Sequence, residues 1–362
     1  MPVIAILAAV LAWIGRQGTR AIAALVLIGL AFPSMDAFLK PFVTEAIFVL
    51  LCTAFLRMDL EALQGYLKRP AVVLATTAWT MLAIPALFGT ICVVGGLKAR
   101  SPGFLLAIML QGVASPMMAA PAFAALMGLD ATLVLVTLVA STALTPFTAP
   151  LFAYAFTGPA LTISPVTLGI KLFVILAGSA LIGFFLRRIA GIATIQRYKE
   201  EIDGFNIFIL FVFVAAVMEN VARHFFDAPL EVIELLAFSF LVYFAVLALT
   251  ILLFARAGLE RALALGFMAS QRNMGLMLAA TGGALPDIAW LYFALAQFPI
   301  YLSPQLLKSL ARRLIAPSQM IMQPANKSPK EKGSAQRINE FDSEEIIAAR
   351  EGKEKYASRR AH

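Results

Sequence analysis

The strongest constraint on this fold is a series of long apolar runs that recurs from residue 21 to residue 307. Each run is almost free of charged residues, and most of them end beside a lysine or an arginine. An α-helix needs about 20 apolar residues to cross a hydrocarbon layer of about 30 Å. Only 14% of the residues are charged and 61% are hydrophobic, whereas about 25% of the residues of a soluble protein are charged. The pattern therefore predicts an all-α, polytopic membrane protein.

Ten of these runs are predicted to be transmembrane helices, five on each side of an uncharged linker at residues 157–165. The first five-helix repeat covers residues 20–156, and the second covers residues 166–314. Before them, Val3–Ile14 is apolar but too short to span, so residues 1–19 are predicted to form a half-length or interfacial helix. The predicted spans are Ala21–Ser34, Phe42–Phe55, Pro70–Val94, Phe104–Leu129, Ala131–Ala155, Val166–Phe185, Phe205–Val221, Val232–Phe254, Ala262–Thr281 and Ile288–Leu307.

The two halves resemble each other in where their helices are interrupted. The fourth run contains Ser115, Pro116 and Pro121, and because proline removes a helical hydrogen bond, a break is predicted near Ser115. The ninth run is interrupted by polar residues, and the fifth run of each half carries a pair of prolines. Since each half has an odd number of spans, the two repeats are expected to be inverted in the membrane. Paired interrupted segments of this kind indicate the binding site of a transporter.

The interruption of the ninth run centres on Arg272, within the segment GFMASQRNMGLMLAATGG at Gly266–Gly283. A charged residue at the centre of a bilayer costs about 2.5–3.5 kcal/mol, so such residues usually face an interior. The neighbouring polar side chains predict a locally opened helix around a cavity. Capping or pairing inside the helix bundle is the alternative. The candidate substrate- or ion-binding residues are Gln111, Ser115, Pro116, Ser270, Gln271, Arg272 and Asn273.

Basic residues in alternate connectors predict the orientation in the cell membrane. One set of connectors holds most of them, and the opposite set holds only Lys40, Lys98, Arg100 and Arg223. The basic-rich set is predicted to be cytoplasmic, which places both ends of the ten-span unit inside. Residues 315–362 are predicted to form a mostly disordered cytoplasmic tail, with one helix beginning at a capping box of Asp342 and Glu345. A solvated tail is the simple interpretation, and contact with anionic lipid is the alternative.

Several other chemistries lack the residues that they need. Cys52 and Cys92 both lie in apolar runs, and the ligand spacings of disulfide frameworks, zinc sites and haem sites are missing. His224 is the only histidine before His362. No nucleophile–base pair or metal cluster is visible, so neither an enzyme nor a cofactor is predicted. The net charge of +8 comes from basic residues at the ends of apolar runs, and it does not indicate a nucleic-acid partner.

The order of these landmarks resembles the bile acid:sodium symporter family. The resemblance rests on FLRMDLEALQGYLKRP, ASPMMAAPAFAALMGLDATLVLVTLVASTALTPFTAP and FMASQRNMGL, and it covers roughly residues 21–307. It implies a panel domain and a core domain, with unwound fourth and ninth helices that cross at mid-membrane. Ser115–Pro121 would then meet Ser270–Asn273, which is the place that the repeat argument also indicates.

This chain departs from the sodium-coupled members at positions that the resemblance assigns to ion ligands. The glutamate position of the second crossing falls on Met268, and the glutamine position falls on Arg272. Polar positions of the fifth span fall on about Val134 and Leu138, and Met117–Phe123 offers no polar side chain. Both sodium sites are therefore expected to be lost, which leaves sodium as a candidate ion without its usual ligands.

Two functions are expected from these observations. The first is a secondary transporter of a small organic anion that does not depend obligatorily on sodium. In it, Arg272 would replace the cation as a fixed counter-charge and attract an anion with two-pronged geometry. The alternative is a membrane sensor or receptor that kept the fold but lost transport. The expected partners are an organic anion and the lipid bilayer, while substrate identity and oligomeric state are left open.

Overall fold

A computed structural model describes residues 2–17, 39–58, 70–282 and 285–322 of the chain. The predicted first span, most of the connector that follows Arg57, and the predicted tail helix lie outside these described residues. The chain divides into two compact units, Met1–Leu314 and Ile315–His362. Each unit is considered by itself, and everything below concerns the first unit unless the second is named.

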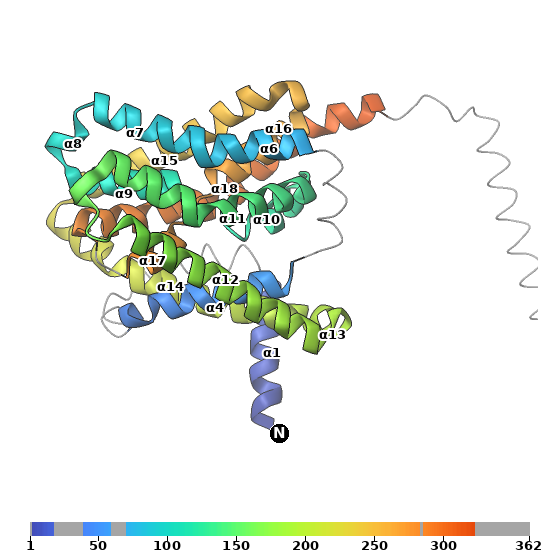
Figure 1. Cartoon of the computed structure of the whole chain (residues 1–362). Helices are drawn as coiled ribbons and strands as arrows, with labels where there is room; N and C mark the ends of the chain where they lie inside the picture. Colours follow the sequence, from blue (N-terminus) through green and yellow to red (C-terminus); the bar gives the residue numbers. More distant parts are fainter. Residues whose placement is uncertain (1, 18–38, 59–69, 283–284, 323–362) are drawn as a thin grey trace, which may run out of the picture. The chain divides into compact units, whose positions relative to one another are not determined.

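Every regular element in the described part of the chain is a helix, and no strand occurs there (Figure 1). The short elements are the 3-10 turns η2 (Lys40–Phe42), η4 (Gly158–Ala160) and η5 (Ala255–Ala257), and the π-helical segment η3 (Trp79–Ala83). The α-helices are α1 (Pro2–Gln17), α4 (Val43–Leu56), α6 (Pro70–Ala78), α7 (Ile84–Val94), α8 (Leu97–Arg100), α9 (Pro102–Val113), α10 (Ala120–Met127), α11 (Ala131–Thr157), α12 (Pro165–Ala190), α13 (Ile192–Arg197), α14 (Lys199–Asp227), α15 (Pro229–Phe254), α16 (Leu259–Ser270), α17 (Met274–Thr281) and α18 (Asp287–Met322).

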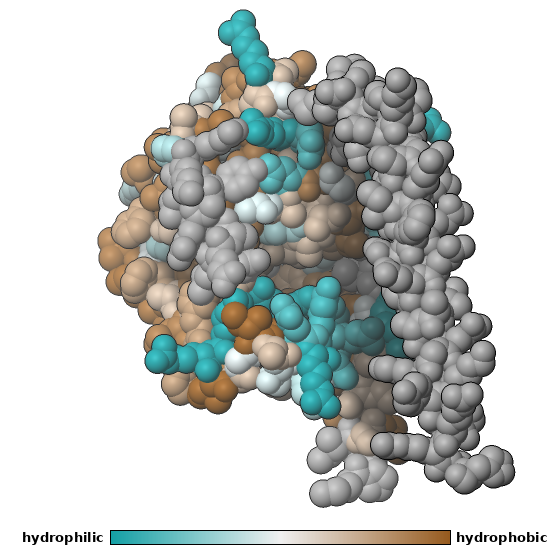
Figure 2. All heavy atoms as spheres, turned by 90° about the vertical axis from the view of Figure 1, so that its right-hand side faces the viewer, coloured by the Kyte–Doolittle hydropathy of each residue, from teal (hydrophilic) through white to brown (hydrophobic). Residues whose placement is uncertain are grey.

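Five helical stretches of the described chain are long and apolar enough to cross a membrane. They are Pro70–Val94, Ala131–Ala160, Pro165–Ala190, Lys199–Met218 and Pro229–Ala257, and shorter apolar helices occur at Ala5–Gln17, Val43–Leu56 and Pro102–Val113. Large apolar side chains such as Leu181 and Leu252 are mostly exposed. Figure 2 shows apolar side chains over much of one face, with polar side chains gathered in separate groups. An exposed apolar surface of this extent suits contact with lipid rather than water.

The helices extend beyond several of the predicted apolar runs. The clearest case is the last one, where the prediction ended at Leu307 but α18 continues to Met322. The predicted change to a tail near Pro317 therefore falls inside a helix, and residues 315–322 of the second unit are helical. Hydropathy indicates where the chain can leave the hydrocarbon layer, but it does not indicate where the helix ends. A helix can continue outside that layer through residues of high helix propensity, such as leucine, arginine, lysine and alanine. The helix therefore extends beyond the predicted end of the last span, and the end of the span itself stays a prediction.

Small residues allow the helices of the N-terminal half to pack closely on α12 and α14. A Cβ atom added at Gly183 of α12 would lie 2.6 Å from the carbonyl oxygen of Cys52 on α4. A Cβ added at Gly204 of α14 would lie 1.8 Å from the carbonyl oxygen of Leu11 on α1. Glycine at such positions lets two helix backbones touch, as is common between membrane helices. These glycines therefore hold α4 against α12 and α1 against α14.

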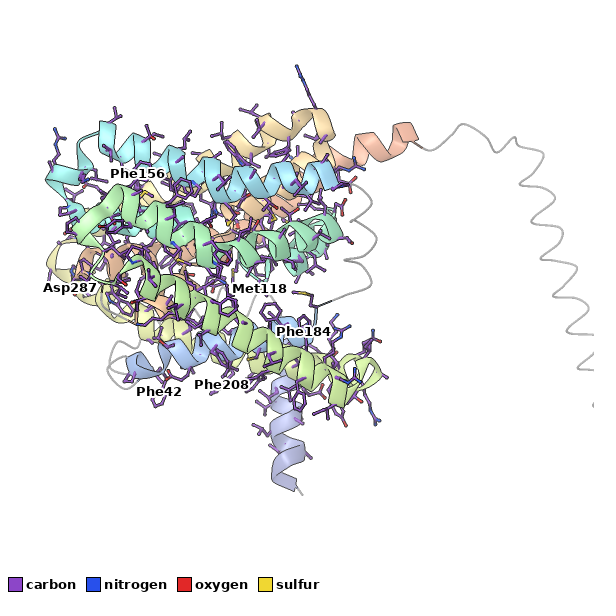
Figure 3. The ribbon with its side chains drawn as sticks, viewed as in Figure 1. Phe42, Met118, Phe156, Phe184, Phe208 and Asp287 are labelled. Carbon is purple, nitrogen blue, oxygen red and sulfur yellow. The ribbon has the colours of Figure 1, made fainter. Side chains whose placement is uncertain are left out.

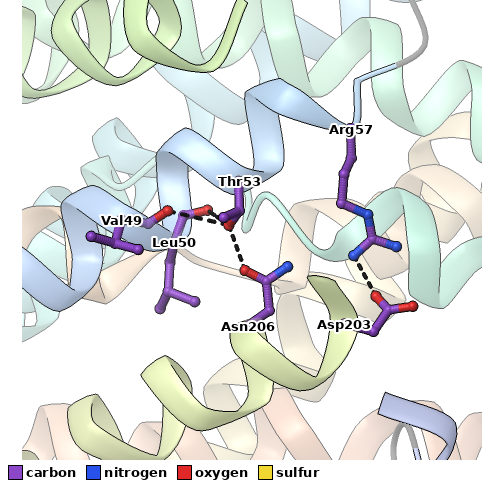
Figure 4. Close-up of polar contacts among 6 residues, drawn as sticks. All are labelled: Val49, Leu50, Thr53, Arg57, Asp203 and Asn206. Carbon is purple, nitrogen blue, oxygen red and sulfur yellow. Dashed lines mark hydrogen bonds and ion pairs between the residues drawn. The ribbon is translucent and has the colours of Figure 1, made fainter. Parts of the chain in front are cut away.

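Polar side chains connect α4 to α14 along the same interface (Figure 4). Thr53 donates to the side-chain oxygen of Asn206, and Arg57 forms an ion pair with Asp203. Arg187, at the end of α12, donates to the carbonyl oxygens of Leu56 and Met58. The ends of α4 and α12 that carry Arg57 and Arg187 therefore lie together, next to the start of α14.

The predicted breaks in the fourth and ninth runs are both present. The fourth run divides into α9, with 12 residues, and α10, with 8 residues. The ninth divides into α16, with 12 residues, and α17, with 8 residues. In both cases the second piece ends at a glycine in the left-handed conformation, Gly128 after α10 and Gly282 after α17. The helices before the two breaks thus have equal lengths, and so do the helices after them.

Candidate functional site

The breaks of the two interrupted segments lie against each other in an antiparallel crossing. Pro116 and Arg272 form an antiparallel bridge. The backbone N–H of Met117 donates to the carbonyl oxygen of Gln271 over 2.7 Å, and the N–H of Asn273 donates to the carbonyl oxygen of Ser115 over 2.8 Å. At each break, backbone N–H and C=O groups lose their hydrogen-bond partners within the helix. These two bonds replace some of those partners, as an apolar environment requires. The sequence prediction that Ser115–Pro121 meets Ser270–Asn273 agrees with this geometry.

Four helix ends therefore converge at the crossing. The helices α9 and α16 end there, while α10 and α17 begin there. Asn273 caps α17, because its side-chain oxygen accepts from the N–H of Leu276 over 3.1 Å. Helix C-termini carry partial negative charge and helix N-termini carry partial positive charge. The crossing thus offers positions for a cation and for an anion side by side.

Arg272 occupies the position that suits a cation. Its side chain is 3% exposed. Its Nη1 donates over 2.8 Å to the carbonyl oxygen of Ala114, the residue that ends α9. The same atom lies 3.4 Å from the carbonyl oxygen of Thr80, at the limit of a hydrogen bond. The guanidinium therefore links the crossing to the segment of the third run that contains Thr80, where the helical hydrogen bonding is also irregular.

The carbonyl group of Thr80 is available because the third run is not a regular α-helix. In η3 the N–H of Ile84 donates to Trp79, five residues back, instead of to Thr80. The next residue, Pro85, has no N–H group. Such π-helical turns expose a carbonyl group and often occur at functional sites. The sequence analysis missed this contribution to the site, and Pro85 is the residue that signals it.

Only one edge of the Arg272 guanidinium has partners. Neither Nε nor Nη2 has a hydrogen-bond partner among the described residues, although both atoms are buried. These two atoms form the side-on fork that binds both oxygens of a carboxylate or a similar anion. Five buried hydroxyl groups also lack partners within the described chain, those of Thr77, Ser115, Thr137, Ser141 and Thr142. A buried polar group without a partner is costly, so these atoms are candidate contacts for water or for a bound molecule.

Contacts on either side place three of these hydroxyl residues between α6 and α11. Val73 packs with Leu133 and Val136, and Thr145 contacts the sulfur of Met81. Thr77 lies one helical turn from both Val73 and Met81, and Thr137 and Ser141 lie at four-residue steps between Leu133 and Thr145. Thr77 therefore lies about one turn before Thr80 in its own segment, and beside the stretch of α11 that carries Thr137 and Ser141.

Two of the predicted site residues contact helices beside the crossing. The side-chain nitrogen of Gln271 contacts Tyr243 Oη at 3.2 Å, Ile300 O at 3.1 Å and Ser303 Oγ at 2.8 Å. These contacts anchor the second break to α15 and α18. Gln111 accepts a hydrogen bond from the hydroxyl group of Tyr292 on α18. Ser270 donates to a carbonyl group of its own helix, that of Phe267, over 2.9 Å.

The structure thus groups the seven predicted residues into three positions. Ser115, Pro116, Arg272 and Asn273 come together at the crossing itself. Ser270 and Gln271 flank it, and Gln111 lies one turn inside α9 and bonds to α18. Tyr243, Tyr292 and Ser303 are contact residues that the sequence analysis did not find, because each lies in an ordinary apolar run far along the chain from its partner.

Two acidic residues that flank the interrupted runs, Asp130 and Asp287, have other positions. Asp130 caps α11 by accepting from the N–H of Leu133 over 2.9 Å. Asp287 is the first residue of α18, and Figure 3 shows it at the edge of the view, well separated from Met118 in the first break. Within the described residues, no group of three or more histidine, cysteine, aspartate or glutamate side chains is placed to hold a metal ion. The described part of the crossing therefore carries one charge, that of Arg272.

Comparisons with known proteins identify the family of the chain. No curated protein matches the chain. The family model for the sodium bile acid symporter family matches residues 44–225, half of the chain. The matched region begins within α4 and includes the first break, while Arg272 and the second break lie beyond it. With apolar helices long enough to cross a membrane and a family match over half its length, the chain belongs to the sodium bile acid symporter family of membrane transport proteins.

Proposed function

We propose that this protein is a secondary transporter of a small organic anion that does not depend obligatorily on sodium, with Arg272 in place of the coupled cation. One observation carries the proposal. Arg272 is buried and uses Nη1 to hold the carbonyl group at the end of α9, while its Nε and Nη2 have no partner among the described residues. One edge of the guanidinium replaces an ion, and the other edge is available to a substrate.

The membrane arrangement that we propose has ten spans in two inverted five-helix repeats. Equal lengths of the half-helices, 12 and 8 residues in both segments, support the repeat. The mutual contacts of α4 with α12 and α14 support a panel domain, and the interrupted helices with α6, α7, α11, α15 and α18 would form the core domain. Both ends of the ten-span unit would face the cytoplasm. The contact of Arg187 with the end of α4 supports this orientation, because it joins two connectors of the basic-rich set.

The anionic character of the substrate follows from the charges at the crossing. A carboxylate or a sulfonate offers two oxygens that match the Nε and Nη2 fork, and hydrogen bonds to a charged group contribute about 1.5–3 kcal/mol. The N-termini of α10 and α17 add partial positive charge. A cationic substrate would be repelled by the same groups.

Sodium independence follows from the position of Arg272. The guanidinium donates to Ala114 O, the kind of helix-end carbonyl group that coordinates sodium in transporters with broken helices. Met268, Val134 and Leu138, which stand at ligand positions of sodium-coupled members, are apolar and buried. A second cation beside Arg272 would meet both repulsion and a lack of oxygen ligands.

Binding to purified protein tests the proposal directly. Taurocholate, a univalent bile-acid sulfonate, and cholate, a univalent carboxylate, serve as probes for shifts in melting temperature and for equilibrium binding, in sodium and in choline buffers. Wild-type protein should bind at least one probe with the same affinity in both buffers. Arg272→Ala should weaken that binding by roughly 10- to 150-fold. Arg272→Lys should recover only part of it, because an ammonium group lacks the fork.

The control is Arg188→Ala, which removes an exposed arginine at the end of α12 and should leave binding unchanged. A steep and saturable dependence of probe binding on sodium would contradict the proposed replacement of the ion. Unchanged binding in Arg272→Ala would remove Arg272 from the substrate site. Probe binding without flux into liposomes would favour the sensor alternative over transport.

A further inference from the structure

We propose that the protein works as an obligatory exchanger of univalent anions, in which the crossing changes its access to the two sides of the membrane only when an anion is bound to Arg272. This inference rests on the proposed function, and it adds a coupling mode to it. The permanent charge of Arg272 carries the inference, together with the lack of a neutralising group beside it in the described structure.

Arg272 is the one charged side chain that is fully buried in the described part of the chain, and it has no ion pair there. Its described partners are the carbonyl oxygens of Ala114 and Thr80. Carbonyl dipoles solvate a charge but do not cancel it. The site therefore keeps a net charge of one when no anion is present.

The unpaired charge of Arg272 affects the transport cycle. In a carrier with alternating access, the binding site passes through a state closed to both sides while one repeat moves against the other. Closing a site around an unpaired charge removes the water that solvates it, which is strongly unfavourable. A bound univalent anion makes the site neutral and removes that cost. The occupied carrier should therefore change state much faster than the empty one.

Coupling by a free cation would give a different cycle. Such a cation leaves with the substrate, so the empty site returns without a trapped charge. Arg272 is part of the chain and cannot leave. Each outward step of an anion must therefore be matched by an inward step of another anion, which is exchange. Because both anions carry one charge, the exchange moves no net charge across the membrane.

The hydroxyl groups around the site favour a univalent anion over a divalent one. Ser115 lies in the first break, Thr77 lies three residues before Thr80, and Thr137 and Ser141 lie on α11, which packs beside that segment. These groups supply neutral donors without adding charge. A dianion would leave one negative charge unbalanced in the same closed state, at a cost similar to that of the empty site. Sulfate is therefore expected to be a poor exchange partner.

Uptake into proteoliposomes tests the coupling mode. Vesicles that hold full-length protein are loaded with unlabelled taurocholate, with chloride or with sulfate, and the uptake of labelled taurocholate is measured. Internal taurocholate should speed uptake by at least about tenfold over internal sulfate, since a barrier difference of about 1.4 kcal/mol gives that factor. Internal chloride is expected to support uptake as well. A potassium gradient with valinomycin should leave the exchange rate unchanged.

The outcomes separate this inference from the proposed function. Equal uptake with any internal salt, driven by membrane potential, would overturn exchange and leave anion transport standing. Absence of both binding and uptake would overturn the two proposals together, and binding without uptake would also refute exchange. Arg272→Gln removes the trapped charge, so any remaining uptake should no longer depend on internal anion. Arg188→Gln, on the exposed end of α12, is the matched control and should behave as wild type.

Discussion

Replacing Arg272 by alanine tests whether the guanidinium holds the two broken helices together. The substitution removes a charged hydrogen bond of 2.8 Å to Ala114 O and leaves that buried carbonyl group without its donor. A hydrogen bond to a charged group contributes about 1.5–3 kcal/mol, while the 3.4 Å contact to Thr80 O adds little. Relief of the buried charge opposes this loss. We expect the free energy of unfolding to fall by about 2 kcal/mol.

The assay is the apparent melting temperature of purified protein in detergent without added anion. At about 2–4 °C for each kcal/mol, the expected decrease is roughly 4–8 °C. Arg272→Met fills a similar volume without charge and should also melt lower, because it leaves the same carbonyl group without a donor. Arg272→Gln keeps a donor, and added sodium is expected to recover part of its loss. If Arg272→Met melts above wild type, the buried charge costs more than its bonds contribute, and the helix-joining role is refuted.

Three further predictions concern the surrounding helices. Gly204→Val should separate α1 from α14, because its Cβ would lie 1.8 Å from a backbone oxygen of α1, and cysteine cross-linking between the two helices should then fail. Pro85→Ala restores an N–H donor to the π-helical turn; because the 3.4 Å contact of Arg272 with Thr80 O adds little, this variant should shift the melting temperature less than Arg272→Ala does. Thr53→Val leaves the side-chain oxygen of Asn206 without this donor and should cost about 1 kcal/mol. Asn206→Leu should cost less, because the Thr53 hydroxyl can still donate to the carbonyl oxygens of Val49 and Leu50; melting temperatures of the two variants check the difference.

The sequence predicted the all-helical fold class and the two breaks because these depend on local chemistry. Pro116 and Pro121 interrupt one apolar run, and Arg272 with its polar neighbours interrupts another. The partners of the site residues could not be predicted in the same way. Gln111 bonds to a tyrosine that lies 181 positions along the chain, so only the packing of α9 on α18 brings the two together.

The same distinction explains what was missed near Thr80. A π-helical turn adds one residue to a helix without changing its hydropathy, so an apolar run gives no sign of it. Pro85 limits which carbonyl groups can be satisfied, but a proline in a membrane helix is consistent with several local arrangements. The neighbouring guanidinium selects one of them, since it supplies the donor that the helix lacks. The site at Thr80 is therefore a property of two segments together.

The two edges of the Arg272 guanidinium explain how a single residue can serve both structure and recognition. The Nη1 edge faces the end of α9, where a helix C-terminus needs positive charge. The edge formed by Nε and Nη2 has no described partner, so bonding an anion there does not compete with the helix contact. A free cation at the same place would have to be captured again in every cycle, and its concentration gradient would drive transport. A cation fixed in the chain gives up that driving force. In the proposed function, it would in return make anion affinity independent of sodium and transfer the coupling to whichever anion occupies the other side.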